Sequence, residues 1–362
     1  MPRPTPPTPS TLPAASQRPP PGRRLRHGAG ALGRLVLTLA ITGLGLLAVT
    51  FFIGRVVPVD PVLAAVGDRA SEATYQAARE ALGLDRPLWE QFLTYVGNAL
   101  TGDFGTSVLT SNPVAVDIAR VFPATLELAT VATILGVLLG VPAGIIAAVR
   151  QGTWTDHVIR VLGLIGYSVP VFWLGLMGLL VFYAKLDWVA GPGRLDLLYV
   201  GLVEPVTGVI LLDSAMAGAW DVFRDALAHI VLPASILGYF SLAYISRMTR
   251  SFMLEQLRQE YITTARVKGL PERTVIGRHA LGNVWVPLVT VIALSYATLL
   301  EGSVLTEIVF SWPGLGFYIT NSLLNADMNA VLGGTVVVGA VFIGLNLLSD
   351  GLYRLLDPRA RP

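Results

Sequence analysis

Residues 260–269 read Glu260-Tyr-Ile-Thr-Thr-Ala-Arg-Val-Lys-Gly269 and lie between two long apolar segments. Pro271 follows this stretch, and then come the segment His279-Ala-Leu-Gly-Asn283 and Pro287. The stretch mixes charged and apolar side chains, whereas the segments on either side of it are almost free of charge. A charged insert at this place indicates a loop that leaves the apolar part of the protein.

The spacing of apolar residues predicts a helix over 254–269, a tight bend, and a second helix. Leu254, Leu257, Tyr261 and Ala265 recur every three or four residues, so they share one helix face. Gly269 suits the left-handed position just past a helix end. Pro271 suits the first position of the next helix, which is expected to run through His279 into the following apolar segment.

Two interpretations of this amphipathic insert stay open on residue chemistry alone. It suits a helix that lies on a membrane surface, where its basic residues would meet lipid headgroups. It equally suits a helix that seats its apolar face in a groove of another protein.

Composition places the chain among multi-pass membrane proteins. Hydrophobic residues make up 53% of the 362 and charged residues only 14%, against about a quarter in soluble domains. The absence of cysteine excludes disulfides, thiolate catalysis and cysteine-based metal sites. None of the 4 histidines has metal-ligand spacing, so we expect no metal, no cofactor and no catalytic residue.

Six apolar runs without Asp, Glu, Lys or Arg are each long enough to cross a bilayer, which takes about 20 residues. We therefore predict an all-α protein with six transmembrane helices and a small extracytoplasmic subdomain after the first. The runs are 35–54, 128–149, 161–184, 226–246, 279–300 and 328–349.

Lys and Arg gather in alternate loops, which predicts that both termini and the insert are cytoplasmic. The boundaries expected from these patterns divide the chain into a disordered Pro-rich tail, a first span, an extracytoplasmic subdomain with helices near 71–82 and 88–100, a transmembrane core, and a short cytoplasmic end. The tail is 1–33, the first span 34–57 and the extracytoplasmic subdomain 58–123. The transmembrane core is 124–357, with a coupling loop at 248–284, and the cytoplasmic end is 358–362.

The ordered set of short motifs resembles the permeases of ABC importers of the dipeptide, oligopeptide and nickel type. Ala265, Gly269, Leu281 and Pro287 match their coupling loop, although Thr263 and Thr264 replace its Glu and first Ala, and Gly282 stands where many permeases have Pro. The resemblance covers roughly 32–360. Further segments that carry it are Leu82-Gly-Leu-Asp-Arg-Pro87, Gly102-Asp-Phe-Gly-Thr-Ser107, Pro123-Ala-Thr-Leu-Glu-Leu128, Ser168-Val-Pro-Val-Phe-Trp-Leu-Gly175, Arg278-His-Ala-Leu-Gly-Asn283, Phe310-Ser-Trp-Pro-Gly-Leu-Gly316 and Leu356-Asp-Pro-Arg359.

The resemblance implies a type I importer permease in the bacterial plasma membrane, with peptides as substrate and nickel or another small solute as the alternative. It implies partners: a second, related permease chain, two ATPase subunits that bind the ATP, an extracytoplasmic substrate-binding protein and membrane lipid, but no nucleic acid. The chain has no phosphate-binding loop of its own. The expected coupling residues are Leu257, Tyr261, Ala265 and Gly269.

Two carboxylates near the outer end of the fifth run are candidates for the pathway or a gate, because an ionisable residue in a span usually faces the protein interior. Glu301 is assigned to the pathway or a subunit interface. For Glu307 a structural role, hydrogen-bonded to the turn at 310–316, weighs equally with a pathway role.

Two rival functions fit the sequence less well. An ion-driven secondary transporter would need ionisable residues at mid-depth, and the runs are almost free of them. An intramembrane enzyme would need a buried acid–base pair or a nucleophile with its base, and no such set is visible.

Overall fold

The computed structural model describes residues 21–356 except 57–60, 68 and 82. Within these residues the regular structure is helical, and the only strand-like pairing is an isolated bridge between Thr106 and Pro113. This agrees with the all-α prediction. Residues 1–20, which belong to the predicted tail, and the predicted cytoplasmic end at 358–362 lie outside the described residues.

The first part of the chain is a long helix followed by three short ones. Residues 21–33 were expected to be disordered with the tail, but they form the start of α1 (Pro21–Val56). The two helices predicted after the first span are confirmed as α3 and α4, and a short helix precedes them. Their bounds are α2 (Pro61–Val66), α3 (Glu72–Ala81) and α4 (Leu88–Thr101).

Five helices are long and apolar enough to cross a membrane, and a sixth span results if one bent pair is counted as a single crossing. The second span begins ten residues before the predicted boundary at 124, because α5 starts at Val114. The long helices after α1 are α5 (Val114–Val149), α9 (Trp220–Leu257), α12 (Leu281–Gly302) and α15 (Met328–Leu356).

The predicted third span is broken. It consists of α6 (Trp154–Ser168) and α7 (Val171–Gly178), the latter continued by the π-helix η1 (Leu179–Lys185), and the two halves bend by 99°. Val169 between them has extended backbone angles and precedes Pro170. A residue before proline is driven out of the helical region, and proline itself offers no N–H, so the helix ends there.

Short elements connect the spans. Between η1 and α9 the chain is irregular except for α8 (Ile210–Met216), and α13 and α14 stand between α12 and α15. The insert holds α10, α11 and the π-helix η2. Their bounds are α10 (Glu260–Val267), α11 (Glu272–Thr274), η2 (Val275–Ala280), α13 (Val304–Val309) and α14 (Leu315–Leu324).

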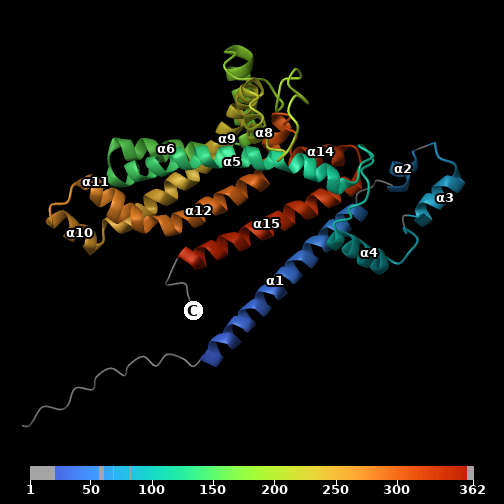
Figure 1. Cartoon of the computed structure of the whole chain (residues 1–362), viewed down its shortest axis with the longest axis horizontal. Helices are drawn as coiled ribbons and strands as arrows, with labels where there is room; N and C mark the ends of the chain where they lie inside the picture. The colour runs from blue at the N-terminus through green and yellow to red at the C-terminus, as the bar shows by residue number, and fades with distance from the viewer. Residues whose placement is uncertain (1–20, 57–60, 68, 82, 357–362) are drawn as a thin grey trace, which may run out of the picture. The chain divides into compact units, whose positions relative to one another are not determined.

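The centre of the bundle is the pair α5 and α9, which lie side by side (Figure 1). Gly136, Gly140 and Gly144 form a row of small residues on α5. A Cβ at Gly136 would lie 2.5 Å from Ser241 of α9, and one at Gly144 would lie 2.6 Å from the carbonyl oxygen of Ser246. Small residues allow this close backbone approach, which is how helices gain packing energy where lipid supplies no hydrophobic drive.

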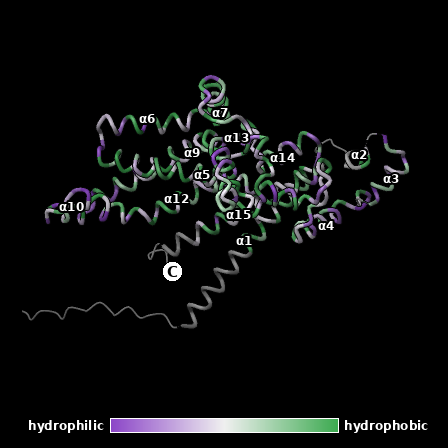
Figure 2. Tube along the Cα trace, turned by 45° about the horizontal axis from the view of Figure 1, so that its top comes forward, coloured by the Kyte–Doolittle hydropathy of each residue, from purple (hydrophilic) through white to green (hydrophobic). Residues whose placement is uncertain are grey.

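The ends of the bundle differ in character. α10 and α11 lie at one end of α9 and α12, and α14 lies near the other end (Figure 1). Hydrophilic residues gather at α10 and at α3, whereas the long helices are mostly hydrophobic (Figure 2). We call these two ends of the bundle the α10 end and the α14 end.

Candidate functional site: the insert and the buried carboxylates

The insert begins with a break that the apolar spacing did not reveal. The predicted single helix over 254–269 is wrong, because α9 ends at Leu257 and Gln259 is extended before α10 begins at Glu260. The apolar spacing continues across this break, since Leu257 and Ala265 still reach one cluster. Spacing alone could not distinguish one helix from two short ones that pack on the same core.

The bend after α10 is as predicted. Gly269 has φ +76°, and the amide of Leu270 donates to the carbonyl of Ala265 over 3.2 Å. This is the left-handed glycine ending of a helix. Pro271 then precedes α11, and the helical path continues through His279 into α12, as expected.

Ala265 does not face a partner surface. Together with Ile262 it is buried in a cluster with Met253, Val275 and Val284 of the same chain, and Leu257 packs against that cluster. The expectation that Leu257, Tyr261 and Ala265 present one open face therefore needs correction. The apolar face of α10 is used to dock the insert onto α9, η2 and α12.

Tyr261 lies at the edge of this packing. Its hydroxyl donates to Gln256 Oε1 over 2.7 Å and accepts from Asn283 Nδ2 over 3.0 Å, which ties α10 to α9 and α12. At the other end of α10, Arg266 forms an ion pair of 2.6 Å with Glu272. The Tyr261 contacts hold α10 against the bundle, whereas the ion pair ties α10 to α11 within the insert.

The open face of α10 is the opposite one. Val267 is 83% exposed, and Glu260, Thr263 and Lys268 are exposed beside it. An exposed valine among charged residues has no packing role in this chain. This face is where a partner has access to the insert.

At the α14 end, Glu307 is fully buried in α13. Its carboxylate accepts hydrogen bonds from Thr125 Oγ1 at 2.8 Å, Ser303 Oγ at 3.0 Å and the amide of Phe317 at 2.9 Å. Burial raises the pKa of Glu307, although these hydrogen bonds oppose the rise. The geometry favours the structural alternative, in which Glu307 holds the chain around the 310–316 turn.

Glu301 lies near the end of α12 and is exposed. It also lines a small cavity of about 40 Å³ with residues of α5, α14 and α15, among them Thr125, Gly316 and Phe342. The structure thus places Glu301 at an accessible surface, whereas Glu307 is enclosed.

A buried ion pair that sequence inspection missed joins α5 to the irregular segment before α8. Arg194 Nε and Nη2 donate to Glu127 Oε2 over 2.8 and 2.5 Å, and Nη2 also donates to the carbonyl of Gly208 over 2.7 Å. The amide of Leu211 donates to the other carboxylate oxygen over 2.8 Å. Glu127 stands one residue before a charge-free run, and that position was the available signal.

Asp213 anchors the same segment from α8. It accepts from the amides of Thr207 and Gly208, each at 2.9 Å, and from the Thr207 hydroxyl at 2.7 Å. Burial would raise the pKa of Asp213, but these hydrogen bonds outweigh it and hold the pKa below its usual range. Glu127 and Asp213 together give the segment a fixed path across the α14 end.

Bent and closely packed apolar helices, with an amphipathic insert docked at one end, are the features of a multi-pass membrane protein. Residues 140–362 match the family described as "Binding-protein-dependent transport system inner membrane component", and residues 31–129 match the N-terminal part of such components. The chain belongs to this family of inner-membrane transport components.

Its relatives are similar along almost the whole chain. It is 44% identical to the probable D,D-dipeptide transport system permease protein DdpB of Escherichia coli K12, over 90% of this chain and 94% of that one. It is 42% identical to the di/tripeptide transport system permease protein DppB of Pseudomonas aeruginosa, over 92% and 98%. With the dipeptide permease protein DppB of E. coli K12 it shares 43% identity, over 91% and 98%.

Proposed function

We propose that this chain is the membrane-spanning permease subunit of an ATP-driven importer and forms half of a pathway for short peptides. The observation that carries the proposal is the 42–44% identity, over at least 90% of the chain, to relatives named as dipeptide or di/tripeptide permeases. These names favour peptides over nickel or another small solute. The chain itself is proposed to be non-catalytic.

The insert is proposed to couple the spans to a separate ATPase subunit. Its open face at Val267 is available for docking, while Leu257, Tyr261, Ala265 and Gly269 build the support beneath that face. Because α10 packs in one cluster with residues of both α9 and α12, a force on α10 would tilt the two spans together. ATP-driven closure of two ATPase subunits is then sufficient to bias the spans between two states.

The remaining partners are proposed on the same ground. A second permease chain completes the pathway, and an extracytoplasmic binding protein delivers the peptide. We propose that the Arg-rich α10 end lies in the cytoplasm together with both termini, and the distribution of basic residues supports this orientation.

Glu301 is proposed to face the pathway or the second permease chain. In that position its carboxylate would attract the amino group of a peptide. We expect Glu301→Gln to lower uptake of peptides with a free amino terminus more than uptake of amino-blocked ones, with assembly unchanged. Equal effects on both kinds of peptide contradict the pathway role.

Reconstituted uptake tests the proposal as a whole. The permease pair is placed in proteoliposomes with the ATPase chains and the binding protein, and accumulation of a labelled dipeptide is measured. We expect accumulation only with ATP and with the ATPase chains present. Accumulation driven by an ion gradient in their absence would identify a secondary transporter instead.

A further inference from the structure

A cavity of about 840 Å³ lies between α6 and α9 at the α10 end of the bundle. Its lining extends from Tyr167 of α6 to Arg258 and Gln259, which are the residues that lead into α10. Pockets of about 300–1,000 Å³ hold small ligands in proteins. The cavity is therefore large enough for a short peptide and lies where the insert meets the spans.

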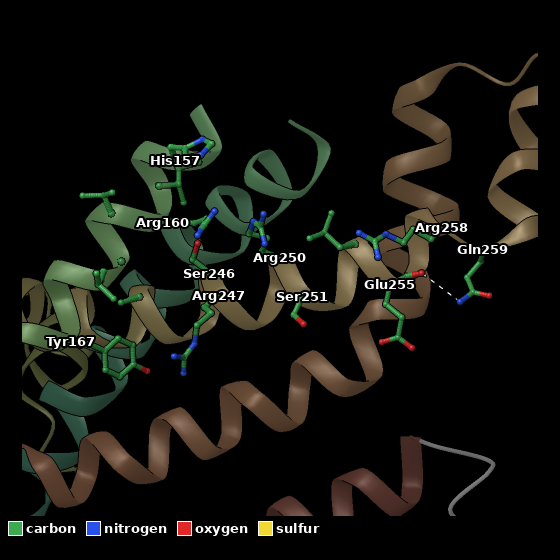
Figure 3. A pocket seen from close by; sticks show the side chains of 16 residues that line it. His157, Arg160, Tyr167, Ser246, Arg247, Arg250, Ser251, Glu255, Arg258 and Gln259 are labelled. Atoms are coloured by element: carbon green, nitrogen blue, oxygen red, sulfur yellow. Dashed lines mark hydrogen bonds between the residues drawn. The ribbon is translucent and has the colours of Figure 1, made fainter. Parts of the chain in front are cut away.

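Three polar side chains line this cavity in a row along α9. Arg247, Ser251 and Glu255 recur every four residues, which places them on one helix face. Figure 3 shows all three on the same side of α9, whereas Arg250 of α9 points toward α6, the helix that carries Arg160. The row has a cation at one end and a carboxylate at the other.

Both charges of the row are available to a ligand. The Arg247 guanidinium lies 5.1 Å from the ring centre of Tyr167 and 5.9 Å from that of Tyr244, contacts that orient it without neutralising it. Across the described part of the chain, the ion pairs leave out Arg247 and Glu255. Arg250 differs, because Asp156 binds it over 2.7 and 2.8 Å.

The length of the row suits a short peptide. Eight residues of helix separate Arg247 from Glu255, a distance of about 12 Å at 1.5 Å per residue. An extended peptide spans about 3.5 Å per residue, so two to four residues fit once the side chains lean inward. A guanidinium recognises a carboxylate through paired hydrogen bonds, and a carboxylate suits an ammonium group.

We propose that this cavity is a binding site for the main-chain termini of a short peptide, with Arg247 at its carboxylate and Glu255 at its amino group. The proposal rests on the proposed function, which makes peptides the substrate. An anionic phospholipid headgroup would also suit the arginines, but Glu255 would repel its phosphate. The mixed charge of the row thus favours a peptide.

Because the chain contains no cysteine, a single introduced thiol can report occupancy of the cavity. Ser251→Cys places the thiol between the two charges. The assembled complex, without the binding protein, is treated with a small maleimide, and labelling of this chain is followed by mass. The probes are trialanine, its N-acetylated form and its C-amidated form, and Gln151→Cys in the exposed turn after α5 is the reference site.

We expect trialanine to slow labelling at Ser251→Cys about threefold at twice its Kd, since two thirds of the sites are then filled. The capped peptides and the added change Arg247→Gln should each abolish that protection. Arg278→Gln, an exposed change outside the cavity, should leave it intact. Labelling at Gln151→Cys should not respond to any peptide.

Equal protection by free and capped peptides would overturn the assignment of the charges. Protection by phosphatidylglycerol nanodiscs but by no peptide would identify a lipid site instead. Uptake by the same complex, placed in proteoliposomes with the binding protein added, separates the two proposals. Transport without protection overturns the site alone, whereas failure of ATP-dependent uptake overturns the function on which the site rests.

Discussion

Buried carboxylates at the α14 end of the bundle act as fixed hydrogen-bond acceptors. Glu127, Asp213 and Glu307 each accept from two or more groups, and at least one of these is a backbone amide in every case. A buried amide without a partner is costly, so each carboxylate holds a short irregular segment in place. These residues stabilise the end of the bundle that faces away from the insert.

We expect Glu307→Ala to destabilise the protein by about 2–4 kcal/mol, because it leaves the amide of Phe317 and the hydroxyl of Thr125 buried without an acceptor. Thermal unfolding of the purified complex measures the change. Glu204→Gln, at an exposed position, is the control and should alter stability by less than about 0.5 kcal/mol. An unchanged melting temperature for Glu307→Ala contradicts this role.

The anchor at Asp213 should respond to acid. The pKa of Asp213 is lower in the folded chain than in the unfolded one. The ionised carboxylate therefore stabilises the fold at pH values above the ordinary carboxyl pKa of about 4. This stabilisation is lost as the pH falls through the lowered pKa of the folded chain. We expect slow hydrogen exchange at the amides of Thr207 and Gly208 near neutral pH. Asp213→Asn should lose this protection at neutral pH. Equal protection in the variant contradicts the anchor.

At the scale of elements, the sequence predicts the positions of spans better than their shapes. Each charge-free run falls on a long helix or on the bent pair, because hydropathy depends on composition. Several helices extend well beyond their run, however: α5 already begins at Val114, and α9 continues to Leu257. The bend at Val169 and the break at Gln259 escape such a reading. In each case the apolar pattern of the sequence runs on without interruption, although the backbone leaves the helical conformation at that residue.

The sequence shows which residues belong to a helix more readily than it shows which neighbour each side chain faces. Helical spacing correctly grouped Leu257 and Ala265, but it could not tell whether their common neighbour was the same chain or another one. The same limit applies to Glu301 and Glu307. They are six residues apart in the sequence, yet Glu301 is exposed and Glu307 is enclosed by three hydrogen-bond donors.

The two faces of α10 make a matched test of the coupling role. Ala265→Asp puts a carboxylate into the chain's own core and should lower stability by about 3 kcal/mol or more. Val267→Asp lies on the open face, so it should leave stability unchanged and weaken association with the ATPase subunits. Thermal unfolding and co-purification of the ATPase measure the two effects.

Full ATPase association by Val267→Asp would exclude the open face as the docking surface. Normal stability of Ala265→Asp would show that α10 does not depend on the packing seen here. Either result would contradict the division of α10 into a supporting face and a docking face.

At the scale of the whole molecule, polar chemistry is segregated by end. The α14 end is fixed by buried carboxylates, the middle by close packing of α5 and α9, and the α10 end carries an exposed helix face and an open cavity. A transporter driven from one side needs this asymmetry. The driven end must accept a partner, while the opposite end must keep its geometry when the spans tilt.

We expect the first 20 residues to be dispensable for membrane insertion and for uptake. The family match begins at residue 31 and α1 begins at Pro21, so a deletion of residues 2–20 leaves both intact, along with the basic cluster Arg23, Arg24 and Arg26 that favours a cytoplasmic N-terminus. We expect the shortened chain to reach the membrane in normal amount and to support ATP-dependent uptake at the full rate.

The matched control is a deletion of residues 2–30, which also removes ten residues of α1 and the three arginines. This longer deletion should reduce correct insertion. Protease accessibility of the α10 loop in inside-out vesicles reports topology, and uptake reports function. Loss of uptake in the shorter deletion with normal topology would show that the tail has a role beyond insertion, and equal insertion by both deletions would show that Arg34 suffices to orient the first span.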